Sequence, residues 1–154
     1  MYQRILVPID GSPTSLQGLA EALRLARLTG GQLRLLHLVD TQSLTMAMGA
    51  YGAFSSDVYD ELQKEGQQIL ENGRQQALAA GVAVDVAMEE GVRSRLAEWV
   101  EEQVKTWPAD LVVLGTHGRR GVGRMLLGSD AEQVVRSCPV PVLLVRGSDA
   151  LPIG

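Results

Sequence analysis

Short apolar runs recur along the sequence and alternate with longer amphipathic stretches. The runs are rich in valine and leucine and mostly continuous rather than alternating, which is typical of strands buried on both faces of a parallel sheet. The predicted strands are Arg4–Ile9, Gln32–Val39, Val82–Met88, Asp110–Gly115 and Pro141–Arg146. Parallel strands need long crossover connections, so we expect the stretches between them to be helical.

Helix start and stop signals fall in those stretches. In the first stretch Ser12 and Pro13 supply an N-cap and a first-turn residue, and Gly30 ends the helix. Its inward face is predicted from helical spacing to hold Leu16, Leu19, Ala20, Leu23 and Ala26. The second helix is expected over about 55–80, and the third over about 94–106. The inward face predicted for the second helix holds Val58, Leu62, Ile69 and Ala77.

The fourth helix is expected to begin at Ser129, where Ser-Asp-Ala-Glu matches a capping box with Ser129 as the N-cap. Five strands joined by four helical crossovers predict an α/β fold with one doubly wound, flavodoxin/Rossmann-like parallel sheet. We find no internal repeat or linker, so residues 1–154 are expected to form a single domain.

Composition restricts the class of ligand. The chain has a net charge of -4 and a pI near 5.2, unlike a general nucleic-acid binder. No apolar run approaches the roughly 20 residues that span a bilayer, and the start has no signal-peptide pattern. The single cysteine, Cys138, excludes an internal disulfide and fits a reducing compartment. We therefore expect a cytoplasmic protein that binds neither nucleic acid nor membrane.

The loops that leave the strands are the candidate binding loops. In an open parallel sheet, ligands bind outside the carboxyl ends of the strands, where the strand order reverses. Asp10-Gly11-Ser12 follows the first strand, and a glycine-rich loop follows the fourth. If those two strands are neighbours, Asp10 and Gly115 border one crevice.

The loop after the fourth strand reads GTHGRRGVGRMLLGS from Gly115 to Ser129. It is not a Walker loop, because no lysine follows its glycines, and it lacks G-x-G-x-x-G. Glycines let backbone amides approach phosphate oxygens, and a helix N-terminus adds partial positive charge. A plain strand-to-helix turn is the alternative. The loop arginines, Arg119, Arg120 and Arg124, either contact phosphate or form a solvated charged surface.

The spacing G-x2-G-x9-G-[ST], formed by Gly115, Gly118, Gly128 and Ser129, resembles the nucleotide-binding signature of the universal stress protein family. MYQRILVPIDGS resembles the opening strand and acidic turn of that family, and LLHLVD its second strand. ADLVVLGTHGRRG and CPVPVLLV resemble its closing half. The resemblance covers the chain apart from about residues 41–55.

The resemblance implies a flavodoxin-like sheet in the order 3-2-1-4-5 that binds ATP, with Mg²⁺ or Mn²⁺ bound through the phosphates. It places Asp10 near the adenosine and the backbone of Val39 against the adenine. Around the ribose and phosphates it places Gly115, Gly118, Gly128 and Ser129. Pro8, Ile9, Thr116, Arg119 and Asp130 complete the residues expected to line the nucleotide. The family also commonly forms homodimers through the last strand, here Pro141–Arg146.

Several alternatives stay open at this stage. The resemblance favours a nucleotide-dependent sensor or adaptor in the stress response, and the rivals are a slow ATPase or phosphotransferase and a structural dimer with a vestigial site. Asp130 either stabilises a helix or serves as a Mg²⁺ ligand. The stretch from Thr41 to Phe54 is a lid, a partner surface or a variable insertion. His37 is predicted to be a satisfied core histidine, and His117 an exposed loop residue.

Overall fold

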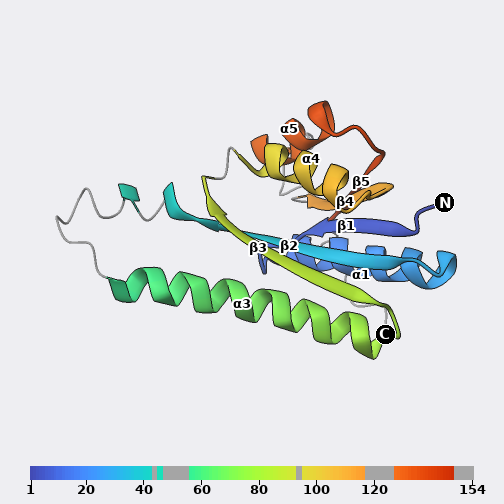
Figure 1. Ribbon diagram of the computed structural model, residues 1–154, viewed down its shortest axis with the longest axis horizontal. Coiled ribbons are helices and arrows are strands. Elements are labelled where there is room, and N and C mark those ends of the chain that lie inside the picture. The colour runs from blue at the N-terminus through green and yellow to red at the C-terminus, as the bar shows by residue number, and fades with distance from the viewer. Residues whose placement is uncertain (43–44, 47–55, 93–94, 117–126, 148–154) are drawn as a thin grey trace.

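The computed structural model describes residues 1–42, 45–46, 56–92, 95–116 and 127–147 (Figure 1). The strands are β1 (Arg4–Pro8), β2 (Gln32–Asp40), β3 (Val84–Gly91), β4 (Leu111–Thr116) and β5 (Val142–Arg146). The helices are α1 (Pro13–Thr29), α3 (Ser56–Ala79), α4 (Leu96–Thr106) and α5 (Ser129–Ser137). Each predicted strand is present, with bounds that lie within three residues of those expected.

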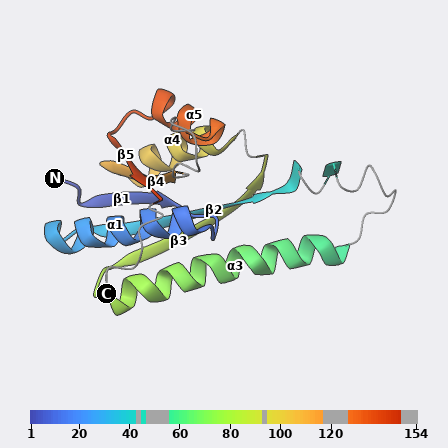
Figure 2. The ribbon, with the colours of Figure 1, turned by 180° about the vertical axis from the view of Figure 1, so that it is seen from behind.

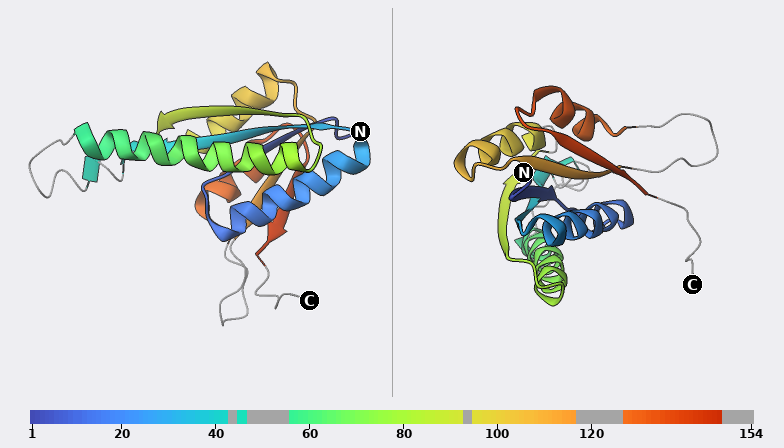
Figure 3. Two further views of the ribbon diagram at one scale, coloured as in Figure 1. Left: turned by 90° about the horizontal axis from the view of Figure 1, so that it is seen from below. Right: turned by 90° about the vertical axis from the view of Figure 1, so that its right-hand side faces the viewer.

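The strands form one parallel sheet in the order β3-β2-β1-β4-β5. Helices α1 and α3 cover one face of the sheet, and α4 and α5 cover the other, as the views from the front, from behind and along the sheet show (Figures 1, 2 and 3). Two apolar clusters fill the spaces between these layers. One contains Leu19 and Leu70 beneath α1 and α3, and the other contains Trp99 and Val134 beneath α4 and α5. The predicted doubly wound fold and strand order are confirmed.

The termini of α1 follow the sequence signals, but its buried face does not. Ser12 is the N-cap and its hydroxyl accepts from the Ser15 amide, while Gly30 ends the helix in the left-handed conformation with φ of 70°. The prediction that Leu16 and Ala20 face inward is wrong, because both are exposed and Leu16 is 38% accessible. The buried residues are Ser15, Gly18, Leu19, Ala22 and Ala26. Small residues let this helix lie close to the sheet, which spacing of large apolar residues does not reveal.

Helix α3 shows the same effect. Its buried residues are Gly66, Leu70, Gly73 and Ala77, whereas Val58 is exposed, contrary to the spacing. A Cβ atom on Gly73 would lie 2.8 Å from the Leu35 side chain, so the helix axis approaches β2 closely. The first turns of α3 are instead tied to the end of β3, where Tyr59 and Gln63 donate to the Glu90 carboxylate. That hydrogen bond to Glu90 raises the pKa of Tyr59.

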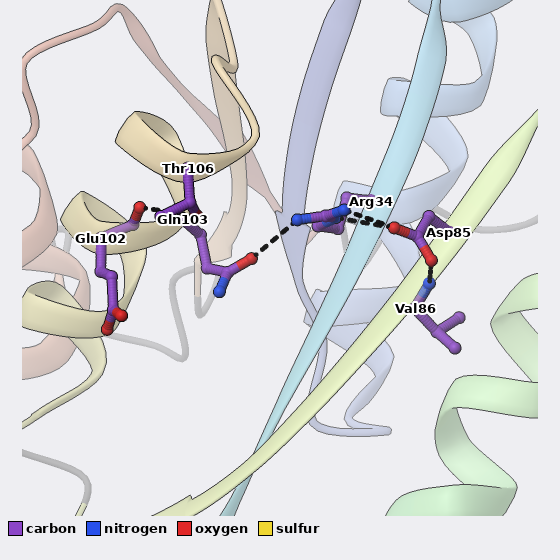
Figure 4. A network of polar contacts seen from close by, with 6 residues as sticks. All are labelled: Arg34, Asp85, Val86, Glu102, Gln103 and Thr106. Carbon is purple, nitrogen blue, oxygen red and sulfur yellow. Dashed lines mark hydrogen bonds and ion pairs between the residues drawn. The ribbon is translucent and has the colours of Figure 1, made fainter.

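A polar cluster joins β2, β3 and α4 at the other end of the sheet (Figure 4). The Arg34 guanidinium donates from Nε to Asp85 at 3.0 Å and from a terminal nitrogen to the Gln103 side chain at 3.1 Å. The Arg34 Cζ atom lies 4.8 Å from the centroid of the Trp107 ring, within the range of a cation–π contact. Arg34 therefore ties the β3 edge to α4 at the end of the sheet opposite the candidate binding loops.

Candidate functional site

The strand order reverses between β1 and β4, which pair through Ile5 with Leu111 and Leu6 with Val112. The chain leaves β1 to form α1 on one face of the sheet, and α5, on the other face, is the next described helix after β4. In an open α/β sheet this reversal opens a crevice at the carboxyl ends of the two strands. The structure thus brings the Pro8–Asp10 segment and the Gly115–Thr116 segment to the same end of neighbouring strands, as the sequence predicts.

Asp10 organises the turn that leaves β1. Its Oδ1 atom accepts from the Ser12 amide at 2.9 Å, and its own amide donates to the Ser15 hydroxyl at 3.3 Å. Gly11 supplies the positive φ of 80° that the turn requires, a conformation that side chains other than glycine rarely adopt. Asp10 is exposed at the carboxyl end of β1, and its carboxylate is held by this turn. Pro8 is half-buried, and Ile9 is buried.

Gly115 is required by packing. A Cβ atom there would lie 1.9 Å from the Thr14 carbonyl oxygen and 2.9 Å from the Ser15 Cα. Gly18 mirrors this approach, since its Cβ atom would lie 2.8 Å from the Gly115 amide nitrogen. The backbones of α1 and β4 are therefore nearly in contact, and the absence of a side chain at Gly115 has a cause inside the protein, independent of any ligand.

Thr116 is the last residue of β4, and its buried side chain bonds to β5. It is 4% exposed, its hydroxyl donates to the Val145 carbonyl at 3.4 Å, and its carbonyl accepts from the Gly147 amide at 3.0 Å. Arg146 lies opposite Thr116 in the β4–β5 register and is exposed. Thr116 thus fixes the start of the glycine-rich loop, and Arg146 is a cation beside it that sequence reasoning did not place in the site.

The N-terminus of α5 lies beyond the glycine-rich loop. Its N-cap is Gly128, and Ser129 is the first helical residue, so the prediction that Ser129 caps the helix is wrong by one position. Because glycine has no side chain, the N-cap residue makes no side-chain cap bond among the described residues, and the Glu132 amide donates to the Gly128 carbonyl. No atom of the described residues lies within 4 Å of a Cβ atom built on Gly128. The Ser129 hydroxyl therefore does not serve as the cap that would compete with a ligand.

Other predicted site residues lie in the glycine-rich loop. Gly118 and Arg119, together with His117, Arg120 and Arg124, fall outside the described residues.

The first turn of α5 is acidic. Asp130 is half-buried there, and Glu132 in the same turn forms an ion pair with Arg136 at 2.7 Å. The helix N-terminus consequently carries two carboxylates whose charge offsets part of its positive field.

Val39 lies one strand away, near the end of β2. The residue is 2% exposed, and the β2–β3 register continues past it to Asp40 and Gly91. The backbone of Val39 therefore lies within the sheet, paired with β3. The prediction that this backbone meets the adenine did not take β3 into account.

His37 is buried, and its Nδ1 atom lies 2.8 Å from the Ile9 carbonyl oxygen, which confirms the prediction of a satisfied core histidine.

A hollow of about 130 Å³ lies next to the ends of β2 and β3, on the α4 side. It is lined by Leu38, Glu89, Glu90, Gly91, Arg95, Glu98, Trp99 and Glu102. Ligand sites usually measure roughly 300–1,000 Å³, so this hollow is too small for a nucleoside. Within the part of the chain that the structure describes, no group of three or more histidine, cysteine or acidic residues could hold a metal ion.

Comparison with known proteins defines the family. The sequence model of the universal stress protein family matches residues 1–146. The chain belongs to the universal stress protein family. A universal stress protein of Methanocaldococcus jannaschii is 33% identical over 147 residues, which are 95% of this chain and 83% of that protein. Another from Bacillus subtilis is 33% identical, with 95% of this chain and all of that protein covered.

Solved universal stress proteins share the fold. A crystal structure from Burkholderia pseudomallei is 29% identical, with a TM-score of 0.72 over 94% of this chain and 96% of that one. The resemblance in the glycine spacing and the flanking strands is thereby confirmed at the level of family and fold. Among the described helices, none is both long and apolar enough to cross a membrane.

Two residues at this end of the universal stress protein fold were missed from the sequence. Ser15 is 7% exposed and bonds to the turn from within α1, and Gly18 provides the contact with Gly115. A glycine in the middle of a helix lowers stability relative to alanine. The presence of Gly18 inside α1 was therefore the sequence signal for a close approach of two backbones. Ser15 gave no comparable signal, because serine near a helix start is common.

Proposed function

We propose that the chain binds ATP in the crevice between the carboxyl ends of β1 and β4, with the phosphates at the N-terminus of α5. The observation that carries the proposal is the reversal of strand order at β1 and β4 beside the N-terminus of α5, whose N-cap residue is Gly128. Such a helix end offers backbone amides and a partial positive charge to an anion. Asp10 on the other side of the crevice presents a carboxylate suited to ribose or adenine donors.

The residues at the crevice fit Mg²⁺ only as a companion of the phosphates. Mg²⁺ is usually held by one or two carboxylates together with substrate phosphates and water. Asp130 stands in the first turn of α5, and the described residues contain no larger cluster of metal ligands. We therefore propose that the ion arrives as the ATP complex, with Asp130 and the Ser129 hydroxyl as the protein groups nearest to it. Bound there, Mg²⁺ would neutralise phosphate charge.

We propose a role as a nucleotide-dependent sensor or adaptor in the cytoplasm. The chain has two lysines, Lys64 and Lys105, and these belong to α3 and α4, so neither supplies the phosphate-binding lysine of a Walker loop. Proteins of this fold include one from Arabidopsis thaliana with AMP bound and one in complex with cAMP. These are 17% and 24% identical, which shows the shared fold alone, so the proposal rests on the crevice.

We further propose a homodimer through β5. This strand lies at an edge of the sheet, and its side chains from Val142 to Val145 are only half-buried. An apolar sheet edge is a liability unless another chain covers it, and pairing with a second copy is a common solution. Light scattering should give twice the chain mass of 16.6 kDa, and Leu144→Lys should lower it. The chain mass for the wild type would contradict this assembly.

The binding proposal is tested in two steps. Mass spectrometry of the small molecules released on denaturation should find ATP or a product of it, and calorimetry should show binding of ATP in the presence of Mg²⁺. Gly118→Val should abolish binding with an unchanged circular dichroism spectrum, because a branched side chain would stand where phosphate must approach. Incubation with labelled ATP separates a sensor from a slow ATPase. An unchanged affinity in the variant would overturn the site.

A further inference from the structure

His37 is a buried polar residue to which the proposed function assigns no part. It lies on β2, is 8% exposed, and its Nδ1 atom lies 2.8 Å from the carbonyl oxygen of Ile9 on β1. A carbonyl oxygen can only accept, so Nδ1 carries the hydrogen and donates it. The imidazole therefore forms a side-chain bridge between the two strands.

The bridge is located where β1 leaves the sheet. The last register pair of the two strands joins Pro8 to Leu36, and the Ile9 amide still donates to the Leu36 carbonyl at 2.8 Å. The Ile9 carbonyl belongs to the peptide group that leads into Asp10. Its orientation sets the direction in which the chain enters the Asp10–Gly11 turn, and His37 fixes that orientation.

Helix α3 and strand β3 hold the ring in place. A Cβ atom on Gly66 of α3 would lie 2.8 Å from the His37 Cδ2 atom and 3.0 Å from the sulfur of Met88 on β3. One turn farther along α3, the Ile69 side chain lies 3.1 Å from the position of a Cβ atom on Gly11. The same part of α3 thus supports both the His37 ring and the turn itself, so the turn is backed by packed groups rather than by solvent.

We propose that His37 is a positioning residue of the nucleotide site, which holds the Ile9–Asp10 peptide so that the Asp10 carboxylate faces the adenosine. This inference rests on the ATP site proposed above. It assigns to the imidazole a task that an apolar side chain of similar size cannot perform. Asparagine can perform it, because its side-chain amide places an N–H donor near the position of Nδ1.

The test compares His37→Leu with His37→Asn in the full-length protein. Calorimetry with ATP and Mg²⁺ should show about tenfold weaker binding for His37→Leu, because the Ile9 carbonyl loses its partner. His37→Asn should stay within about threefold of the wild type. Val104→Ala, in the core under α4 on the opposite face, is the control for a general loss of stability and should leave the affinity unchanged.

Two further measurements do not depend on ATP. The nitrogen NMR spectrum of the wild-type ring should show hydrogen on Nδ1, and hydrogen exchange at the amides of Gly11 and Ser12 should quicken in His37→Leu but not in His37→Asn. If the wild type binds no ATP, the proposed function fails, and these two readouts still decide whether His37 fixes the turn. A folded His37→Leu protein with wild-type ATP affinity and wild-type exchange at the turn would overturn the inference.

Discussion

Two helices begin at the same end of the sheet, and their N-termini are built in opposite ways. Helix α1 starts with Ser12 as a side-chain cap and Pro13 in its first turn, and it has no acidic residue there. Helix α5 starts with Gly128, has no side-chain cap bond, and carries Asp130 and Glu132 in its first turn. The first is capped by a serine side chain, and the second has a glycine at its N-cap position.

From this difference we propose that α1 anchors the fold and that α5 binds the ligand. The α1 end is locked by hydrogen bonds among Ser12, Thr14 and Ser15, and its backbone nearly touches Gly115 of β4. At Gly128 of the α5 end, a Cβ atom would meet no atom of the described residues within 4 Å. The first amides of a helix are a general site for anions, so we propose that the phosphates bind at α5 and that the start of α1 has a structural task.

The largest expected effect is a difference in stability between alanine variants of the two glycines that flank the loop. Gly115→Ala should lower the free energy of unfolding by at least about 3 kcal/mol, because its Cβ atom would meet backbone atoms of α1 that cannot move aside. Gly128→Ala is the matched control and should cost at most about 1 kcal/mol, the difference between the two residues as an N-cap. Urea denaturation of both variants measures this. Equal losses would show that α1 and β4 are not in close contact.

A smaller effect compares the two serines. Ser12→Ala should cost about 1 kcal/mol of unfolding free energy, since it removes the cap of α1. Ser129→Ala should change stability by less than about 0.5 kcal/mol, because Ser129 is not a cap. The binding of ATP with Mg²⁺ should show the opposite order, because Ser129→Ala should weaken it more than Ser12→Ala does. A larger stability loss from Ser129→Ala would mean that α5 is capped like α1.

The smallest effect concerns the acidic first turn of α5. Asp130→Asn should strengthen binding of metal-free ATP by a few-fold and reduce the gain that Mg²⁺ brings, because one carboxylate fewer opposes the phosphates. The helix should lose about 0.3 to 1 kcal/mol from the lost charge at its positive end. Calorimetric titrations in chelator and in excess Mg²⁺ provide the comparison. An identical metal response in both proteins would leave Asp130 as a helix-stabilising residue only.

The sequence was informative where large apolar residues or chain-turning residues dominate. The strands, the Ser12 cap and the Gly30 end of α1 were predictable because each depends on local chemistry. The inward faces of α1 and α3 were not, since Gly18, Gly66 and Gly73 decide them through backbone approach, and periodicity counts only larger side chains.

The position of the candidate site in the fold was predictable, but the packing around it was not. The carboxyl ends of β1 and β4 follow from the family resemblance and the topology, and the structure confirms that they are neighbours. The role of Gly115 in packing depends on the distance between α1 and β4, which no local pattern contains. The shift of the α5 cap from Ser129 to Gly128 is a one-residue difference that Gly-Ser-Asp permits in either register.

The central claim is that an anionic nucleotide binds at the N-terminus of α5 and not at that of α1. Titration of the isotopically labelled protein with ATP and Mg²⁺, followed through its backbone amide NMR signals, tests it directly. We expect the largest shifts at Ser129, Asp130 and Ala131, with Thr14, Ser15 and Leu16 of α1 moving little. Large shifts in the first turn of α1 with none in α5, or no shifts in either helix, would contradict the account.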